Sequence, residues 1–297
     1  MTIKKRFQIV CAVWLVALHS GADRPDRKTF NLPESIAYST RSYVEGHGRA
    51  TELGIAVQKK HMGRKEPLPT VVFIHGGGWR NGDKDQHVWE CVEYARRGYV
   101  AITLSYRLMD EAPFPQCIED VKTAIRFIKS LAVEYPIDAD NIGVWGYSAG
   151  AHLALMVGLS HEDEWFRSDL YPDFESSVKC AVAIATPTYF SHVTRRNSVM
   201  SEKQSKDPAF IERVSPLSYI NKDQIPILMI HGTEDRIVPP HHYRTFKNSS
   251  LEKGVENFTL IEAEGGGHMF FFKERSYKKV VYDYFEANLK KGKKEQK

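Results

Sequence analysis

A serine between two glycines, at the junction of two apolar segments, constrains the fold of this chain most. Residues 146–150 read Gly-Tyr-Ser-Ala-Gly; they follow the apolar residues 141–145 and precede a helix-compatible apolar run over residues 152–159. This order is typical of a nucleophile elbow, where a side chain at either glycine would collide with the strand or the helix. Such a turn would hold the hydroxyl of Ser148 out for attack. Glycines also flank serine in ordinary turns, so the rest of the chain decides between the two interpretations.

Apolar, β-branched segments alternate with amphipathic segments along most of the chain. This alternation predicts an α/β domain with a mostly parallel central sheet and helices on both faces. Within residues 36–57, apolar and polar residues alternate as in half-buried strands, which predicts an antiparallel hairpin at the sheet edge. The expected strands are residues 70–74, 99–104, 142–145, 181–185, 225–230 and 258–262, and the expected helices are residues 85–97, 115–135, 152–159 (opening after Ser148) and 274–289.

One long segment, residues 189–218, does not fit the alternation. It is polar and charged apart from Phe190 and Phe210, and it lies between two expected strands. We therefore expect a short cap over the site. The 297 residues with 42% hydrophobic content suit one large domain, and no internal repeat is present.

The first residues resemble an export signal. Lys4, Lys5 and Arg6 precede an apolar stretch over residues 7–18, and small residues follow at positions 20–22. This pattern predicts a cleaved signal peptide over residues 1–22, a secreted or periplasmic protein and a mature domain over residues 23–297. The alternative is a membrane anchor, but the stretch is shorter than the roughly 20 residues that span a bilayer, so no stable anchor is expected.

Charge and cysteine usage exclude some classes of protein. The three basic residues at the start supply three of the four net positive charges, so a nucleic-acid partner is not indicated. Three scattered cysteines remain beyond the signal, which predicts buried thiols rather than a disulfide framework; one disulfide plus one free thiol is the alternative. These cysteines are Cys91, Cys117 and Cys180.

A serine nucleophile needs a base, and the base needs an orienting carboxylate. A polar loop after residues 225–230 offers Asp235 and its neighbour Glu234, of which we favour Asp235 by a modest margin. A glycine run after the last strand ends at His268, our candidate base. The order Ser148, Asp235, His268 is the one expected for α/β-hydrolases. The rival histidines are His152, His231, His241 and His242.

An oxyanion formed by that attack needs backbone N–H donors. Residues 75–79 read His-Gly-Gly-Gly-Trp directly after an expected strand, so we assign the donors to Gly77, Gly78 and Ala149. A phosphate loop is the alternative, but its Lys-Ser/Thr ending is missing. No sequence motif for a catalytic metal occurs, and we expect neither a metal nor a cofactor.

With these residues in place, the chain resembles the α/β-hydrolase superfamily over nearly its whole mature length. Within it, the chain is similar to the feruloyl and acetyl xylan esterase-like carbohydrate esterases, relatives of the hormone-sensitive-lipase-like esterases. The resemblance implies Ser148 as nucleophile, Asp235 as acid and His268 as base. The segments that carry it are residues 75–84, 105–108, 112–115, 119–122 and 231–239.

The chain departs from that family near the nucleophile and the base, where Tyr147, Ala151 and Met269 stand in place of common glycines. Trp79 and Tyr147 are candidates for the wall of a substrate pocket, and core packing is an equally weighted interpretation. For the pair of Arg107 with Asp120, also quoted from the family segments, we favour a structural ion pair over a substrate clamp.

These features predict a secreted serine carboxylesterase for short acyl or aromatic-acid esters, such as acetyl and feruloyl groups on plant polysaccharides. Its partner would be a small-molecule or carbohydrate ester. The alternatives are an arylformamidase, a serine peptidase of the prolyl-oligopeptidase type, and a binding protein with an inactive hydrolase fold. A peptidase of that type usually has an additional propeller domain, for which this length leaves no room.

Overall fold

The computed structural model of the protein describes residues 30–190 and 199–290. The expected signal peptide, residues 1–22, lies outside the described residues, as do residues 191–198 of the expected cap. Residues 1–31 and residues 32–297 form separate units, and every described helix and strand belongs to the second.

The described residues form an eight-stranded sheet in the order β1-β2-β4-β3-β5-β6-β7-β8. The neighbouring strands from β4 to β8 run parallel, whereas β2 is antiparallel to both β1 and β4. Ile36 pairs with Gln58 across the first two strands, which confirms the edge hairpin. The strands are β1 Ile36–Ser42, β2 Glu52–Gln58, β3 Leu68–Ile74, β4 Val100–Leu104, β5 Ile137–Tyr147, β6 Cys180–Ile184, β7 Ile227–Gly232 and β8 Phe258–Ala263.

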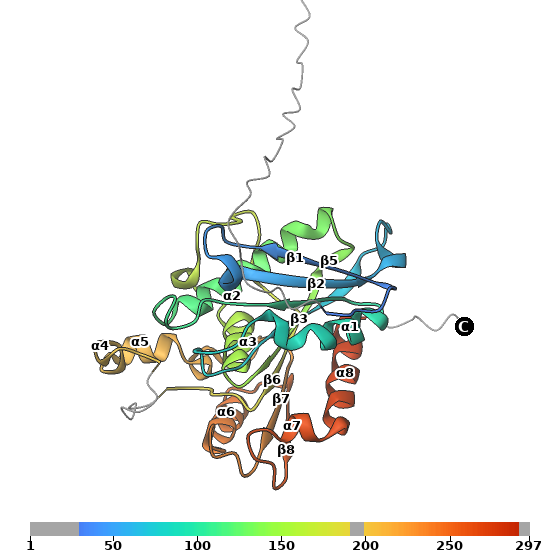
Figure 1. Ribbon diagram of the computed structural model, residues 1–297. Helices are drawn as coiled ribbons and strands as arrows, with labels where there is room; N and C mark the ends of the chain where they lie inside the picture. The colour runs from blue at the N-terminus through green and yellow to red at the C-terminus, as the bar shows by residue number, and fades with distance from the viewer. Residues whose placement is uncertain (1–29, 191–198, 291–297) are drawn as a thin grey trace, which may run out of the picture. The chain divides into compact units, whose positions relative to one another are not determined.

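Helices cover both faces of this sheet (Figure 1). One apolar core contains side chains of α2, α3 and α6, and the other contains side chains of α1, α7 and α8. The predicted α/β fold is therefore confirmed. The helices are α1 Val88–Arg96, α2 Gln116–Ser130, α3 Ala149–Leu159, α4 Glu202–Ser205, α5 Pro208–Arg213, α6 His241–Glu252, α7 Phe270–Lys273 and α8 Arg275–Leu289.

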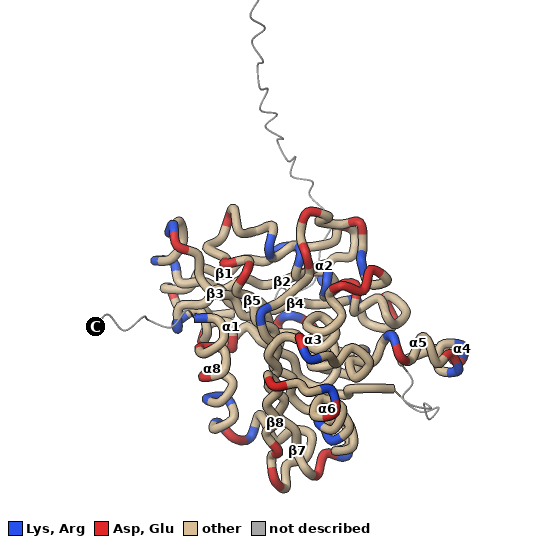
Figure 2. Tube along the Cα trace, turned by 180° about the vertical axis from the view of Figure 1, so that it is seen from behind, with Lys and Arg blue, Asp and Glu red and all other residues tan. Residues whose placement is uncertain are grey.

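Strands β3, β4, β6 and β7 are largely apolar because both of their faces are buried. In β3, Val72 and Ile74 face one core while Val71 and Phe73 face the other, as the two-residue period of a strand requires. Strands β3, β4, β6 and β7 contain no Lys, Arg, Asp or Glu, whereas the helices and loops carry many of them (Figure 2). All of α3 is buried, which explains why it is hydrophobic on every side.

The sequence located some helices imprecisely and missed others. The expected helix over residues 85–97 begins as a 3₁₀ turn, Lys84–His87, before α1. The helix expected to reach residue 135 ends at Ser130. Helix α6 was not predicted because it is mostly polar and buries only Tyr243, Phe246 and Ser250.

The described part of the expected cap, residues 189–190 and 199–218, contains α4 and α5. In both views these helices lie on the side of α3 that is opposite to α8 (Figures 1 and 2). The two phenylalanines of the cap, Phe190 and Phe210, pack against the apolar core that contains α3. The ring of Phe114 lies 5.8 Å from that of Phe190 and 6.4 Å from that of Phe210. In the described part of the chain, no helix combines the length and the apolarity that crossing a membrane requires.

Candidate active site

Ser148 lies on a strained turn between β5 and α3. Its backbone has φ 54° and ψ −118°, a region that costs a non-glycine residue about 1–3 kcal/mol. The turn is held by a hydrogen bond from the Ser148 N–H to the Ile184 carbonyl, at 2.8 Å. A Cβ on Gly146 would lie 2.1 Å from the Gly150 carbonyl oxygen, and one on Gly150 would lie 2.1 Å from the Ile74 carbonyl oxygen. Both glycines are therefore required by the close approach of strand and helix.

The side chains of Ser148, His268 and Asp235 form a hydrogen-bonded chain, although they come from three separate loops. His268 Nδ1 lies 2.7 Å from Asp235 Oδ2, and His268 Nε2 lies 3.1 Å from Ser148 Oγ. An ionised carboxylate only accepts hydrogen bonds, so Nδ1–H donates to Asp235 and the Ser148 hydroxyl donates to Nε2. The structure brings together the three residues that the sequence singled out.

Asp235 is buried, and both of its carboxylate oxygens accept hydrogen bonds. Its Oδ1 accepts hydrogen bonds from the N–H groups of Ile237 and Val238, each at 2.9 Å. Burial alone would raise the pKa of Asp235, but the hydrogen bonds from His268 and the two amides lower it below its usual value. Glu234, the alternative acid, is exposed at the surface. Asp235 is thus the carboxylate in position to orient His268.

The rival histidines are held elsewhere. His152 is buried in α3 with Nε2 2.8 Å from the Val214 carbonyl, and burial lowers its pKa to about 4. His242 accepts from the Thr188 N–H at 3.3 Å, and His241 is exposed beside it.

His231, the remaining rival, lies against the acid rather than the nucleophile. Its Nε2 is 2.8 Å from the Val238 carbonyl and 3.5 Å from Asp235 Oδ2. Burial lowers the pKa of His231, so its neutral ring donates to Val238 and supports the loop that surrounds Asp235. The sequence did not reveal this supporting role.

The predicted oxyanion loop lies against the nucleophile. A Cβ on Gly76 would be 3.5 Å from Ser148 Cβ, which places the loop beside the elbow. Gly77 and Gly78 have φ 110° and 62°, and both are exposed at the surface. Ala149 is the first residue of α3, so its N–H has no acceptor within the helix. The loop therefore lies beside Ser148, and Ala149 follows Ser148 directly in the chain; the assignment of their N–H groups as oxyanion donors stays a prediction.

A ring stack and a hydrogen bond hold the start of this loop. The ring of His75 stacks on Tyr106 with 4.3 Å between centroids, and the Tyr106 hydroxyl donates to the His75 carbonyl at 3.1 Å. His75 Nδ1–H donates to the Gly76 carbonyl at 2.7 Å, and burial lowers the pKa of His75 to about 4. The imidazole is therefore neutral and structural.

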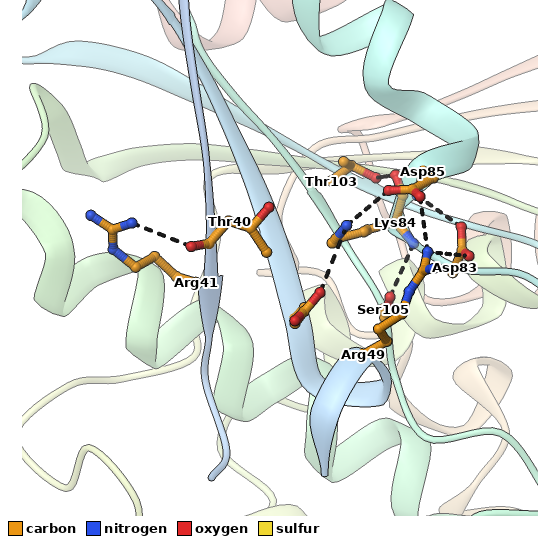
Figure 3. A network of polar contacts seen from close by, with 9 residues as sticks. Thr40, Arg41, Arg49, Asp83, Lys84, Asp85, Thr103 and Ser105 are labelled. Carbon is orange, nitrogen blue, oxygen red and sulfur yellow. Dashed lines mark hydrogen bonds and ion pairs between the residues drawn. The ribbon is translucent and has the colours of Figure 1, made fainter. Parts of the chain in front are cut away.

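A polar network anchors the segment that follows the loop (Figure 3). Lys84 is buried, with its ammonium group 2.8 Å from Asp85, and its backbone N–H donates to Ser105 Oγ at 3.0 Å. Arg49 pairs with both Asp83 and Asp85, at 3.0 and 2.9 Å. The network ties the residues after the glycine loop to the end of β4.

The two candidate pocket residues have different surroundings. Trp79 is 8% exposed and packs against Phe114, His152 and Phe190, with ring centroids 5.3–6.1 Å away. Tyr147 is also 8% exposed, and its hydroxyl lies 2.6 Å from the His268 carbonyl. Both side chains are mostly packed, and their place in a substrate pocket stays a prediction.

The remaining predictions from the sequence concern structural residues. Arg107 binds Asp120 through Nε at 3.0 and 3.1 Å and through its backbone N–H at 2.9 Å, which confirms the buried ion pair. The three cysteines are free and buried, so the disulfide alternative was wrong. Among the described residues, no group of three or more His, Cys, Asp or Glu could hold a metal ion.

A family model named BD-FAE matches residues 56–249, which is more than half of the chain. The chain belongs to the BD-FAE family. The matched region contains the glycine loop, the elbow and the loop of Asp235, while His268 lies beyond its end.

Several curated relatives of this chain carry esterase names. Esterase LipC of Mycobacterium tuberculosis is 27% identical over 224 residues, 72% of this chain and 55% of its own length. The probable isoprenylcysteine alpha-carbonyl methylesterase ICMEL1 of Arabidopsis thaliana is 23% identical over 84% of this chain and 55% of its own. The chain therefore spans about half the length of these relatives.

Solved structures show the same architecture. A truncated carbohydrate esterase from gut microbiota has a TM-score of 0.75 at 26% identity, covering 86% of this chain and 97% of its own. The propionate-bound thermophilic esterase Est2 of Thermogutta terrifontis has a TM-score of 0.72 at 25% identity, covering 86% and 95%. Together with the strand order, these likenesses show that the BD-FAE member has an α/β-hydrolase fold.

Proposed function

We propose that this chain is a serine carboxylic ester hydrolase. The observation that carries the proposal is the hydrogen-bonded chain from Asp235 through His268 to Ser148, placed beside a glycine loop. The esterase names of its relatives support the same reaction class.

The proposed reaction proceeds through an acyl-enzyme. Ser148 Oγ attacks the ester carbonyl while its proton passes to His268 Nε2, and the N–H groups of Gly77, Gly78 and Ala149 stabilise the oxyanion. His268 then returns the proton to the leaving alcohol as the C–O bond breaks. A water attacks the acyl-enzyme with the same proton transfers, releasing the acid and restoring Ser148. Asp235 keeps His268 in the required tautomer throughout.

The proposed substrates are short acyl and aromatic-acid esters, with acetyl and feruloyl groups on plant polysaccharides as the candidate natural class. The support for a carbohydrate ester is the gut-microbiota carbohydrate esterase, whose structure this chain resembles. We further propose that residues 1–22 direct export, which the N-terminal sequence of protein recovered from the medium or periplasm of an expressing bacterium tests. A start within a few residues of position 23 supports export, and an intact Met1 opposes it.

The test of the reaction uses the purified protein and p-nitrophenyl acetate. Ser148→Ala is expected to lower kcat by about 10⁴-fold or more, whereas Ser35→Ala, at an exposed position, should retain full activity. A fluorophosphonate should label Ser148 stoichiometrically, as detected by peptide mass spectrometry. Est2 of Thermogutta terrifontis is phosphonylated by sarin, which makes such a probe suitable. Turnover that survives in Ser148→Ala would refute the assignment.

A substrate panel separates the competing functions. Acetylated xylan, methyl ferulate, aryl esters of increasing chain length, N-formylkynurenine and a peptide anilide are compared by kcat/KM. A preference for the two amide substrates would replace the esterase by an arylformamidase or a peptidase. Absence of both turnover and labelling would indicate a binding protein.

A further inference from the structure

The Tyr147 hydroxyl connects the nucleophile strand to the loop of the candidate base. Tyr147 is the last residue of β5, directly before Ser148. Its hydroxyl donates to the backbone carbonyl of His268 at 2.6 Å, and its ring lies 5.2 Å from the imidazole. The residue beside the nucleophile thus binds the main chain of the base.

We propose that Tyr147 is a positioning residue, which sets the distance between His268 and Ser148 by holding the His268 carbonyl. This inference rests on the proposed function, because it assigns His268 the role of base. It also replaces a substrate-wall role for Tyr147 by a role in alignment.

The base loop needs such a contact because it contains three consecutive glycines. Other hydrogen bonds hold its glycines: Gly265 N–H donates to Thr233 Oγ1 and Glu234 N–H donates to the Gly266 carbonyl, each at 2.9 Å, and Phe270 N–H donates to the Gly267 carbonyl at 3.0 Å. None of these bonds is made by the main chain of His268. The Tyr147 hydroxyl acts at His268 itself.

The hydroxyl is well suited to this task. It is buried, and burial raises its pKa, so it stays protonated and able to donate. The Met269 sulfur also lies 3.1 Å away, but a thioether is a weak acceptor, so the single proton goes to the carbonyl. The Tyr147 ring further packs on Phe272 at 4.8 Å, which keeps the hydroxyl in place.

Tyr147→Phe removes this hydrogen bond and retains the ring. The distance from His268 Nε2 to Ser148 Oγ is already 3.1 Å, and a misplacement of about 1 Å can cost about 100-fold in rate. We expect kcat for p-nitrophenyl esters to fall about 10-fold, with KM unchanged within about twofold. The fall should be equal for acetyl, butyryl and octanoyl esters, because alignment of the base does not depend on the acyl group.

The matched control is Tyr284→Phe, which removes another buried tyrosine hydroxyl, one that has no hydrogen-bond partner among the described residues. It should leave kcat unchanged. Wild-type kcat in Tyr147→Phe would overturn the proposal. So would a change in KM that grows with acyl length, because that result would make Tyr147 part of the acyl pocket.

A second measurement does not depend on turnover. The low-field proton resonance of the His268 Nδ1–H, identified by its loss in His268→Ala, should broaden in Tyr147→Phe and not in Tyr284→Phe. An unchanged line width would overturn the positioning role even if the wild-type protein hydrolyses no ester. Conversely, failure of the wild-type protein to hydrolyse esters would refute the proposed function while this resonance still tests the contact.

Discussion

Replacing Asp235 by asparagine should reverse the tautomer of His268. The two oxygens of Asp235 are distinguished by their partners: Oδ1 accepts from the N–H groups of Ile237 and Val238, and Oδ2 accepts from His268 Nδ1–H. In Asp235→Asn the amide oxygen must face the two N–H groups, so the NH₂ group must face His268. A facing donor forces Nδ1 to accept, and the ring proton then moves to Nε2, where it points at Ser148.

A base that already carries a proton at Nε2 cannot accept one from Ser148. The expected loss in kcat is about 10⁴-fold, which corresponds to about 5 kcal/mol of transition-state stabilisation. The two backbone hydrogen bonds survive, so the fold should be retained in circular dichroism and the melting temperature should change by only a few degrees.

The assay is the steady-state hydrolysis of p-nitrophenyl acetate by matched preparations. Glu234→Gln is the control, since it removes the neighbouring, exposed carboxylate and should keep activity within about twofold of the wild type. An Asp235→Asn variant that stays within tenfold of the wild type would refute the tautomer argument. A large loss in Glu234→Gln would transfer the acid role to the neighbour.

Two further predictions concern the glycine loop and the buried histidines. Gly77→Ala should lower kcat about 100-fold or more, because its Cβ would lie 1.9 Å from the Asn81 carbonyl oxygen; Gly78→Ala, with nothing within 4 Å, should stay within about tenfold in the same ester assay. Burial lowers the pKa values of His75 and His152 to about 4, whereas a histidine in the unfolded chain has a pKa of about 6.5. Between these pH values the unfolded chain binds more protons than the folded one, so the free energy of unfolding falls as the pH falls, by up to about 3 kcal/mol per histidine. Urea unfolding at several pH values gives the free energy of unfolding as a function of pH. Below about pH 6.5 this free energy should fall less steeply in His152→Gln than in the wild type, and an identical pH dependence would contradict the argument.

Much of the fold could be predicted because each buried strand is marked by a short apolar run in the sequence. A strand buried on both faces must be apolar at successive positions, as in β3, and such a run is visible without knowledge of its partners. Helix α6 is the opposite case, because it buries few side chains and its sequence is mostly polar. It is placed by the few side chains that contact the core, so the pattern gave no signal.

In the candidate site, too, some residues could be predicted from the sequence and others could be assigned only from the structure. Glycines at positions 146 and 150 were readable, since only a residue without a side chain allows the approach that the structure shows. Residue chemistry favoured Asp235 over Glu234 only by a modest margin, because both are carboxylates and only the direction of the turn separates them. The structure separates them by burial and by the two amide donors at residues 237 and 238.

The contacts that hold the site loops were the hardest to predict, and their chemistry explains why. Tyr106 and Tyr147 both use a phenol to bind a backbone carbonyl, at His75 in the glycine loop and at His268 in the base loop. Every residue carries a carbonyl, so nothing in the sequence marks the acceptor. Tyr147 was therefore interpreted only as a pocket wall or a core residue. A phenol that is mostly ring also packs well in a core, which hides the polar role further. The positions of the two loops therefore depend on tyrosine hydroxyls whose role the sequence does not indicate. Replacing such a tyrosine by phenylalanine keeps the ring, so it tests the contribution of the hydroxyl alone.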